Sequence, residues 1–246
     1  MKRRLAFMLS CSTIFIASWV PLAAGAERVR IHGRVTDFND MPQEGVVVHL
    51  KNENFDNLYS THSGKDGSYE LMVEPAVYFC MYAVQEAEYG KTRLEYWAWN
   101  IPALSDLEIN PQYERLEVYA LNAFKPQVTP HETFMVYVRP MSLSRQVSKY
   151  GLGVKPNIKP GDVVDIAPAN LEAKDLDLRV NGKRTRIMSV SKVKEYARGS
   201  YIFGYLLQGV VTPGTTGPIP GYDLITLIVK DPETGDTGKG DYFYRR

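Results

Sequence analysis

The chain has 246 residues, of which 44% are hydrophobic and 23% charged, with 29 Lys plus Arg against 28 Asp plus Glu. This composition is typical of a globular protein with a sizeable core. It excludes a low-complexity chain, and the balanced charge gives no indication of nucleic-acid binding.

The first 26 residues carry the pattern of a cleaved signal peptide. Three basic residues at positions 2–4 precede an apolar run over 5–20, and small residues at 24–26 suit the cleavage site. A membrane anchor is the alternative, but the run is shorter than the ~20 residues that span a bilayer. We therefore expect a secreted protein, periplasmic or extracellular, that does not span the membrane. Without these residues 26 basic side chains face 28 acidic ones, and Cys80 is the only cysteine, so no intrachain disulfide forms.

Apolar and polar residues alternate with period two through the first half, which predicts half-buried strands. In the opening strand the apolar face carries Val29, Ile31, Gly33 and Val35, and the opposite face carries Arg28, Arg30, His32 and Arg34. We expect acidic residues of neighbouring strands to balance this basic stripe. Further strands are predicted at 46–50, 69–73, 77–83, with Val77, Phe79, Met81 and Ala83 on one face, and 116–120. They predict one β-sandwich over residues 27–124.

A proline-containing segment at 125–130 predicts a linker. Short strands follow over residues 131–246, predicted at 134–139, 163–166, 176–180, 186–190, 201–207, 222–229 and 242–244. Asn181-Gly182 predicts a hairpin, because both residues tolerate positive φ. Loops are expected at Gln146–Gly161 and Thr212–Gly221. The pattern fits an immunoglobulin-like sandwich, so the predicted fold class is all-β with two sandwich domains.

Particular residues of the first half carry a family resemblance. They are Gly33, Val35, Asp37, Pro42, Gly45, Val46, Val48, Gly67-Ser68-Tyr69, Pro75 and Tyr78. On these positions the segment 28–124 resembles the carboxypeptidase regulatory-like domain, a transthyretin-like β-sandwich that accompanies many exported proteins. The resemblance implies a transthyretin-like fold followed by the immunoglobulin-like one, and it implies no activity.

No catalytic constellation is visible in the sequence. The histidines are His32, His49, His62 and His131, and none has the spacing of a zinc centre. Ser63 lacks a Gly-x-Ser-x-Gly context, and Cys80 lies inside an apolar strand, where cysteine is usually a small buried hydrophobe. We predict no enzyme, no cofactor and no metal. One alternative stays open, a hydrolase with its site between the domains, for which Lys149, Tyr150, Asp162 and Glu195 are the residues to inspect.

An acidic turn near the C-terminus leaves a second question open. Asp231, Glu233, Asp236 and Asp241 bring carboxylates close together, and such oxygen-rich loops can hold calcium. The interleaved glycines equally fit an ordinary solvated turn.

The aromatic segment 96–100 is the best candidate for ligand binding. In an extended strand Trp97 and Trp99 point to one side and Tyr96 to the other, so the two indoles can form a flat platform for sugar rings, with Asn100, Glu95 or Arg93 bonding hydroxyls. The competing interpretation is that both indoles are simply buried. We predict a non-catalytic binding or structural accessory protein with a polysaccharide ligand at Tyr96, Trp97, Trp99 and Asn100. A protein–protein interaction module of an envelope assembly is the alternative.

Overall fold

The computed structural model describes residues 27–127, 133–154, 157–210, 214 and 216–246. The predicted signal peptide and most of the predicted linker lie outside these residues. Within them the protein is an all-β sandwich, as the alternation predicts, with one α-helix, α1 (Leu143–Tyr150), and one 3-10 turn, η1 (Ala173–Asp175). In this described part no helix is both long and apolar enough to cross a membrane.

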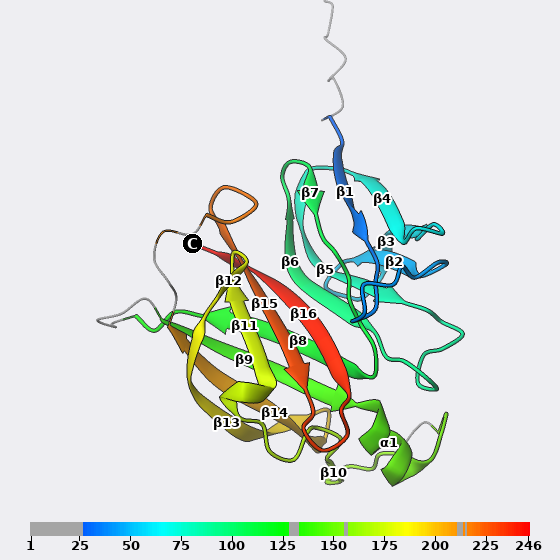
Figure 1. The fold of residues 1–246 in the computed structure, drawn as a ribbon, viewed down its shortest axis with the longest axis vertical. Coiled ribbons are helices and arrows are strands. Elements are labelled where there is room, and N and C mark those ends of the chain that lie inside the picture. The colour runs from blue at the N-terminus through cyan, green and yellow to red at the C-terminus, as the bar shows by residue number, and fades with distance from the viewer. Residues whose placement is uncertain (1–26, 128–132, 155–156, 211–213, 215) are drawn as a thin grey trace, which may run out of the picture.

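The strands form three sheets (Figure 1). The first contains β4 (Ser68–Val73), β1 (Val29–Arg34) and β7 (Leu107–Glu108). The second and largest runs in the order β12 (Lys183–Arg184), β11 (Leu176–Val180), β15 (Tyr222–Lys230), β16 (Thr237–Arg245), β6 (Tyr96–Ala103), β5 (Ala76–Val84), β2 (Val47–Lys51) and β3 (Asn57–His62). The third runs β10 (Val163–Val164), β14 (Ser200–Val210), β9 (Thr133–Ser142) and β8 (Leu116–Phe124), and β13 (Arg186–Ala197) also pairs with β14.

The large sheet is shared by the two halves of the chain. Its centre is a parallel pairing of β16, red in Figure 1, with β6, in which Gly240 lies opposite Trp97 and Tyr242 opposite Trp99. Strand β8 likewise pairs with β9, across the predicted linker. Strand pairing therefore runs across the expected domain boundary, and the division at 125–130 stays a prediction.

Two hydrophobic cores lie against opposite faces of this shared sheet. The first joins β1, β4 and β7 to one face, through buried residues such as Ile31, Leu71 and Val48. The second joins β8, β9 and β14 to the other face, through residues such as Val118, Val136 and Ile225. Successive side chains of a strand point to opposite faces, so one strand can supply both cores. On β6, Tyr96 and Ala98 belong to the first core and Trp97 and Trp99 to the second.

Local features of the sequence appear in the structure where expected. Ile31 and Val35 are fully buried in the first core. The basic stripe of β1 is balanced by acids, because Arg28 pairs with Glu74, and Arg30 pairs with Glu70 and Asp106. Asn181 and Gly182 form the turn between β11 and β12 with positive φ of 51° and 78°.

Two local expectations are wrong. Residues Gln146–Tyr150 belong to α1 rather than to a loop, because Ser142 caps the helix and accepts a hydrogen bond from the Arg145 backbone N–H. The residues at 77, 79, 81 and 83 do not share a face: Met81 and Ala83 lie in the first core, whereas Val77 and Phe79 are partly exposed. The side chains of β5 change from one face to the other opposite Asn100, because its φ of 56° interrupts the regular alternation.

Candidate functional site

The aromatic segment is buried rather than displayed. Trp97 and Trp99 stack with ring centroids 5.2 Å apart and planes inclined by 15°, so they do lie on one side of β6. They are only 6% and 8% exposed, and the ring of Tyr119 packs edge-on against both. Tyr96 is fully buried on the other side, where its hydroxyl donates a hydrogen bond to Asp241. The indole faces are therefore not an open platform.

A pocket of about 560 Å³ lies beside the second indole, and we call it the Trp99 pocket. Its lining comes from β2 and the turn that follows it, β3, β5, β6, β8 and β16: Lys51, Asn52, Glu53, Leu58, Val77, Tyr78, Phe79, Trp99, Asn100, Ala120, Leu121, Asn122 and Tyr242. It includes two of the four predicted site residues, Trp99 and Asn100. The pocket lies where β8, the last strand of the third sheet, borders the face of β6 and β5.

The Trp99 pocket has an apolar, partly exposed wall. Leu58, Val77 and Phe79 are 47%, 46% and 36% exposed. Phe55, 38% exposed, packs edge-on against Phe79 at 5.5 Å and against Trp99 at 6.5 Å between centroids. Exposed large apolar side chains are common singly, but a contiguous group of them marks an interaction site.

The backbone around the pocket is strained in three places. Asn100, Ala120 and Phe55 adopt left-handed φ values of 56°, 53° and 64°. Such values are uncommon outside glycine, and Ala120 sits in a β-bulge where the pairing of β8 with β9 shifts between Tyr119 and Asn122. Asn100 is held in place because its side-chain amide donates a hydrogen bond to the Phe243 carbonyl. Strained residues and bulges gather at functional sites, so the geometry singles out this pocket.

The two indole N–H groups have different partners. The Nε1 of Trp97 donates to Glu117 at 2.9 Å and to Glu95 at 3.2 Å. The Nε1 of Trp99 is buried, and in the described residues it has no acceptor. A buried donor without an acceptor lowers the stability of the fold by about 1–3 kcal/mol. The residues beside the pocket therefore carry a second unfavourable feature, besides the left-handed backbone.

Glu95 and Glu117 form a buried carboxyl pair. Loss of solvent raises the pKa of Glu95 to about 7, although hydrogen bonds from Trp97, Glu117 and Tyr89 oppose that rise. Burial, followed by the nearby charge of Glu95, raises the pKa of Glu117 well above its usual range. The aromatic-platform hypothesis assumed that Glu95 can bond ligand hydroxyls. Because Glu95 is buried and paired with Glu117, it is not available for that role.

The candidate nucleophiles have structural roles. The Ser63 hydroxyl donates to the Gln43 carbonyl at 2.6 Å and accepts from the Val46 backbone N–H at 2.9 Å. Cys80 is fully buried in the second core, and burial raises its thiol pKa to about 12. His49 stacks on Tyr82 and bonds Ser60. Ser63 and Cys80 are buried, and His49 is half-buried.

The residues named for a site between the domains have separate partners. Glu195 bonds Arg139 and Tyr137, Asp162 accepts from the Lys159 backbone N–H, and the Lys149 ammonium donates to the Val163 carbonyl. Tyr150 lies under the Lys149 ammonium.

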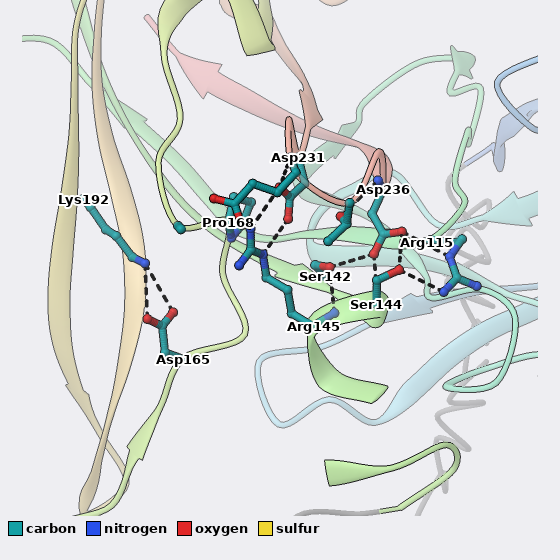
Figure 2. A network of polar contacts seen from close by, with 12 residues as sticks. Arg115, Ser142, Ser144, Arg145, Asp165, Pro168, Lys192, Asp231 and Asp236 are labelled. Atoms are coloured by element: carbon teal, nitrogen blue, oxygen red, sulfur yellow. Dashed lines mark hydrogen bonds and ion pairs between the residues drawn. The ribbon is translucent and has the colours of Figure 1, made fainter. Parts of the chain in front are cut away.

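The acidic turn is neutralised by protein groups (Figure 2). Asp231 is fully buried and forms a two-point ion pair with Arg145, with its carboxylate 2.6 and 3.1 Å from the guanidinium. Asp236 pairs with Arg115, and Asp241 lies on the first-core side with Tyr96. Arg145 also donates to Glu233, and among the described residues no cluster of three or more metal-ligating side chains occurs.

Sequence reasoning missed most of the pocket wall. Phe55 and Leu58 belong to a segment that carries no period-two pattern, and β3 itself was not predicted. The carboxyl pair was missed because Glu95 and Glu117 are 22 residues apart and meet only when β6 and β8 pack together. The alternation of β8, in which Glu117 falls between apolar residues, was the one available signal.

Comparison with known proteins finds only a distant likeness. No family model and no curated protein sequence matches the chain. The chain is similar to a DUF3823 family protein from Parabacteroides merdae, with 8% identity over 89% of this chain and 100% of that chain, and a TM-score of 0.27. It is similar to BcpA, the major pilin subunit of Bacillus cereus, with 9% identity, 88% and 67% coverage and a TM-score of 0.27. It is also similar to the major pilin SpaD from Corynebacterium diphtheriae, with 10% identity over 87% of this chain and 64% of that chain, and a TM-score of 0.24. TM-scores this low support no conclusion about the function of this chain.

Proposed function

We propose that the chain is an exported, non-catalytic binding protein whose Trp99 pocket holds an extended apolar segment of a partner protein. The observation that carries this proposal is the group of exposed apolar side chains, Leu58, Val77, Phe79 and Phe55, gathered around one pocket. Leaving such a group in water is unfavourable by about 25 cal/mol per Å² of apolar surface, so a partner that covers it is stabilised.

Strand β8 provides the second argument for a protein partner. In the described residues β8 pairs on one side only, with β9, and its residues 120–122 line the pocket. An edge strand offers backbone N–H and C=O groups to an added strand, while neighbouring pockets receive alternate side chains. The bulge at Ala120 shortens the usable edge, so we expect a short segment with one or two anchoring side chains.

A carbohydrate ligand is the second candidate. It is favoured by three asparagines of the lining, Asn52, Asn100 and Asn122, whose amides suit sugar hydroxyls. Against it stands the burial of both indoles, because a sugar ring stacks on an open aromatic face.

We further propose that the chain is exported and that its first half belongs to the carboxypeptidase regulatory-like group. The signal-peptide pattern of residues 1–26 supports export to the periplasm or beyond. Membership of the carboxypeptidase regulatory-like group is supported by the roles of its matching glycines: a Cβ on Gly33 would lie 1.9 Å from the Ile109 carbonyl oxygen, and Gly67 has a φ of 79°. We further propose that residues 27–124 and 131–246 are the two units of this architecture.

The test is a binding screen with a matched control. Protein comprising residues 27–246 is panned against a random peptide library and, separately, against an array of bacterial polysaccharides and peptidoglycan fragments. We expect peptides rich in apolar residues, whose affinity falls about tenfold or more in Phe79→Ser. Met188→Ser is the control, because Met188 is 52% exposed on β13 and outside the pocket. Glycan binding lost in Phe79→Ser would favour the second candidate. Affinities unchanged in Phe79→Ser, or clean turnover in a hydrolase panel, would contradict the proposal.

A further inference from the structure

Two glutamates meet at a single indole N–H inside the protein. Glu95, just before β6, is 6% exposed, and Glu117 of β8 is 4% exposed. Both side chains accept from the Nε1 of Trp97, at 3.2 and 2.9 Å. Because both glutamates contact the same N–H, their carboxyl groups lie close together, and a proton on one of them allows it to donate to the other.

The surrounding charges do not neutralise a doubly ionised pair. Every neighbouring element contributes a titratable or charged group: Lys51 of β2, His49 of β2, Tyr82 of β5, Tyr89 of the following loop, Tyr119 of β8 and Arg139 of β9. Arg139 is engaged by Glu195, with Nη2 2.6 Å from Oε1. Lys51 is engaged by Asn57 and the Phe55 carbonyl. Among the described residues no cation forms an ion pair with either glutamate, so a second negative charge would be unbalanced.

We propose that Glu95 and Glu117 act as a one-proton switch, which holds Trp97 in place while the proton is shared and releases the contact between β6 and β8 when the proton leaves. When both buried carboxyl groups are ionised they repel each other, and water must enter to solvate them. Because Trp97 stacks on Trp99, movement of the first indole is passed to the wall of the Trp99 pocket. The consequence for ligand binding rests on the proposed function, whereas the switch itself does not.

The direction of the pH effect follows from burial. The folded protein binds this proton more tightly than the unfolded chain, since burial raises the pKa of both carboxyl groups. Stability from the pair is therefore fully present below the ordinary glutamate pKa, and it is lost progressively as the pH rises from that pKa through the folded-state pKa values, which for Glu95 is about 7.

The indoles provide a specific readout. The sequence has three tryptophans, and the third, Trp19, lies in the predicted signal peptide, so the fluorescence of residues 27–246 reports only Trp97 and Trp99. Emission and the urea midpoint are measured from pH 5 to 9. We expect one sigmoidal change of emission in the folded protein, with a red shift at high pH. The urea midpoint should fall as the pH rises from 5 towards the midpoint of the emission change.

Variants separate the pair from other titrating groups. Glu95→Gln/Glu117→Gln keeps acceptors for Trp97 and should lose the transition, and Glu117→Gln alone should move its midpoint. His49→Gln is the matched control: His49 stacks on Tyr82, which contacts Trp97 at 4.9 Å, but burial lowers its pKa from 6.5, so the transition should persist.

The switch is refuted by flat emission in folded wild-type protein, by a transition that survives in the double variant, or by one that vanishes in His49→Gln. If the double variant does not fold, the wild-type urea midpoint decides: a value that is constant or rises between pH 5 and 9 overturns the proposal. No ligand is used, so this outcome is independent of the outcome of the binding screen.

Discussion

Removal of the Asp236 carboxylate should cost the protein a large part of its stability. Asp236 is 3% exposed and joins the β15–β16 hairpin to the start of α1 (Figure 2). One oxygen accepts from the Ser144 hydroxyl at 2.8 Å and from Arg115 at 3.1 Å. The other accepts from the Ser142 hydroxyl at 2.6 Å and from the Ser144 backbone N–H at 2.8 Å. Asp236→Ala removes both acceptor oxygens, and with them four hydrogen bonds, while the donors remain.

The magnitude follows from what happens to those donors. Breaking a buried charged pair on one side costs about 3–5 kcal/mol, and each donor left without an acceptor about 1–3 kcal/mol. The Arg115 side chain is 40% exposed and can be solvated when its partner is removed, so its contribution to the loss of free energy is smaller. Ser142 is fully buried, so its hydroxyl cannot find water as a replacement acceptor. We therefore expect a loss of about 3 kcal/mol, or a Tm lower by about 10 °C in a chain of this size. Asp236→Asn keeps one acceptor oxygen and should lose about half as much free energy.

The assay is urea unfolding followed by circular dichroism, with a comparison of midpoints at constant slope. Glu233→Ala is the control, because Glu233 is 55% exposed at its contact with Arg145 and should change stability by less than about 1 kcal/mol. Added calcium should not raise the wild-type Tm, since arginines engage Asp231 and Asp236. A loss below about 1 kcal/mol in Asp236→Ala, or equal losses in the Ala and Asn variants, would refute this reasoning. A calcium-dependent rise of Tm that Asp236→Ala removes would restore the calcium hypothesis.

Two further predictions concern the packing of the shared sheet. A Cβ on Gly238 would lie 1.8 Å from the Leu116 carbonyl oxygen, so Gly238→Ala should destabilise the protein by about 3 kcal/mol or more in urea unfolding. Gly64→Ala is the control, because a Cβ at Gly64 would meet no atom closer than 3.4 Å. This substitution should cost less than about 1 kcal/mol of unfolding free energy. Equal losses in the two variants would contradict the close approach of β8 to β16. The Cys80 thiol is buried and its pKa is raised to about 12, so a thiol reagent at pH 8 should modify residues 27–246 only after unfolding in urea. Rapid modification of the folded protein would show that the second core is open at this strand.

Much of the fold could be predicted because its causes are local. The alternation from Val29 to Val35 places Ile31 and Val35 in the first core, and the opposite face needs acids to balance its arginines. Asn181 and Gly182 form a hairpin turn because both accept positive φ. The side of β6 on which each aromatic residue lies follows from the same two-residue period.

The candidate site could be predicted only in part. Alternation puts Trp97 and Trp99 on one side of β6, but it does not say what covers them. Their burial depends on Tyr119 of β8, and the Trp99 pocket combines β3, β5, β6 and β8. Glu95 looked available for a ligand in the sequence and is instead paired with Glu117.

By itself the sequence determined that the chain is all-β, where several of its strands lie and which residues of a regular strand share a face, because these properties depend on neighbours two or three positions away. Only the tertiary structure decided that β6 pairs with β16, more than 130 residues later, and that the large sheet serves both cores. The identity of a neighbouring strand depends on the packing of the whole chain. Period-two patterning is the same for every candidate partner.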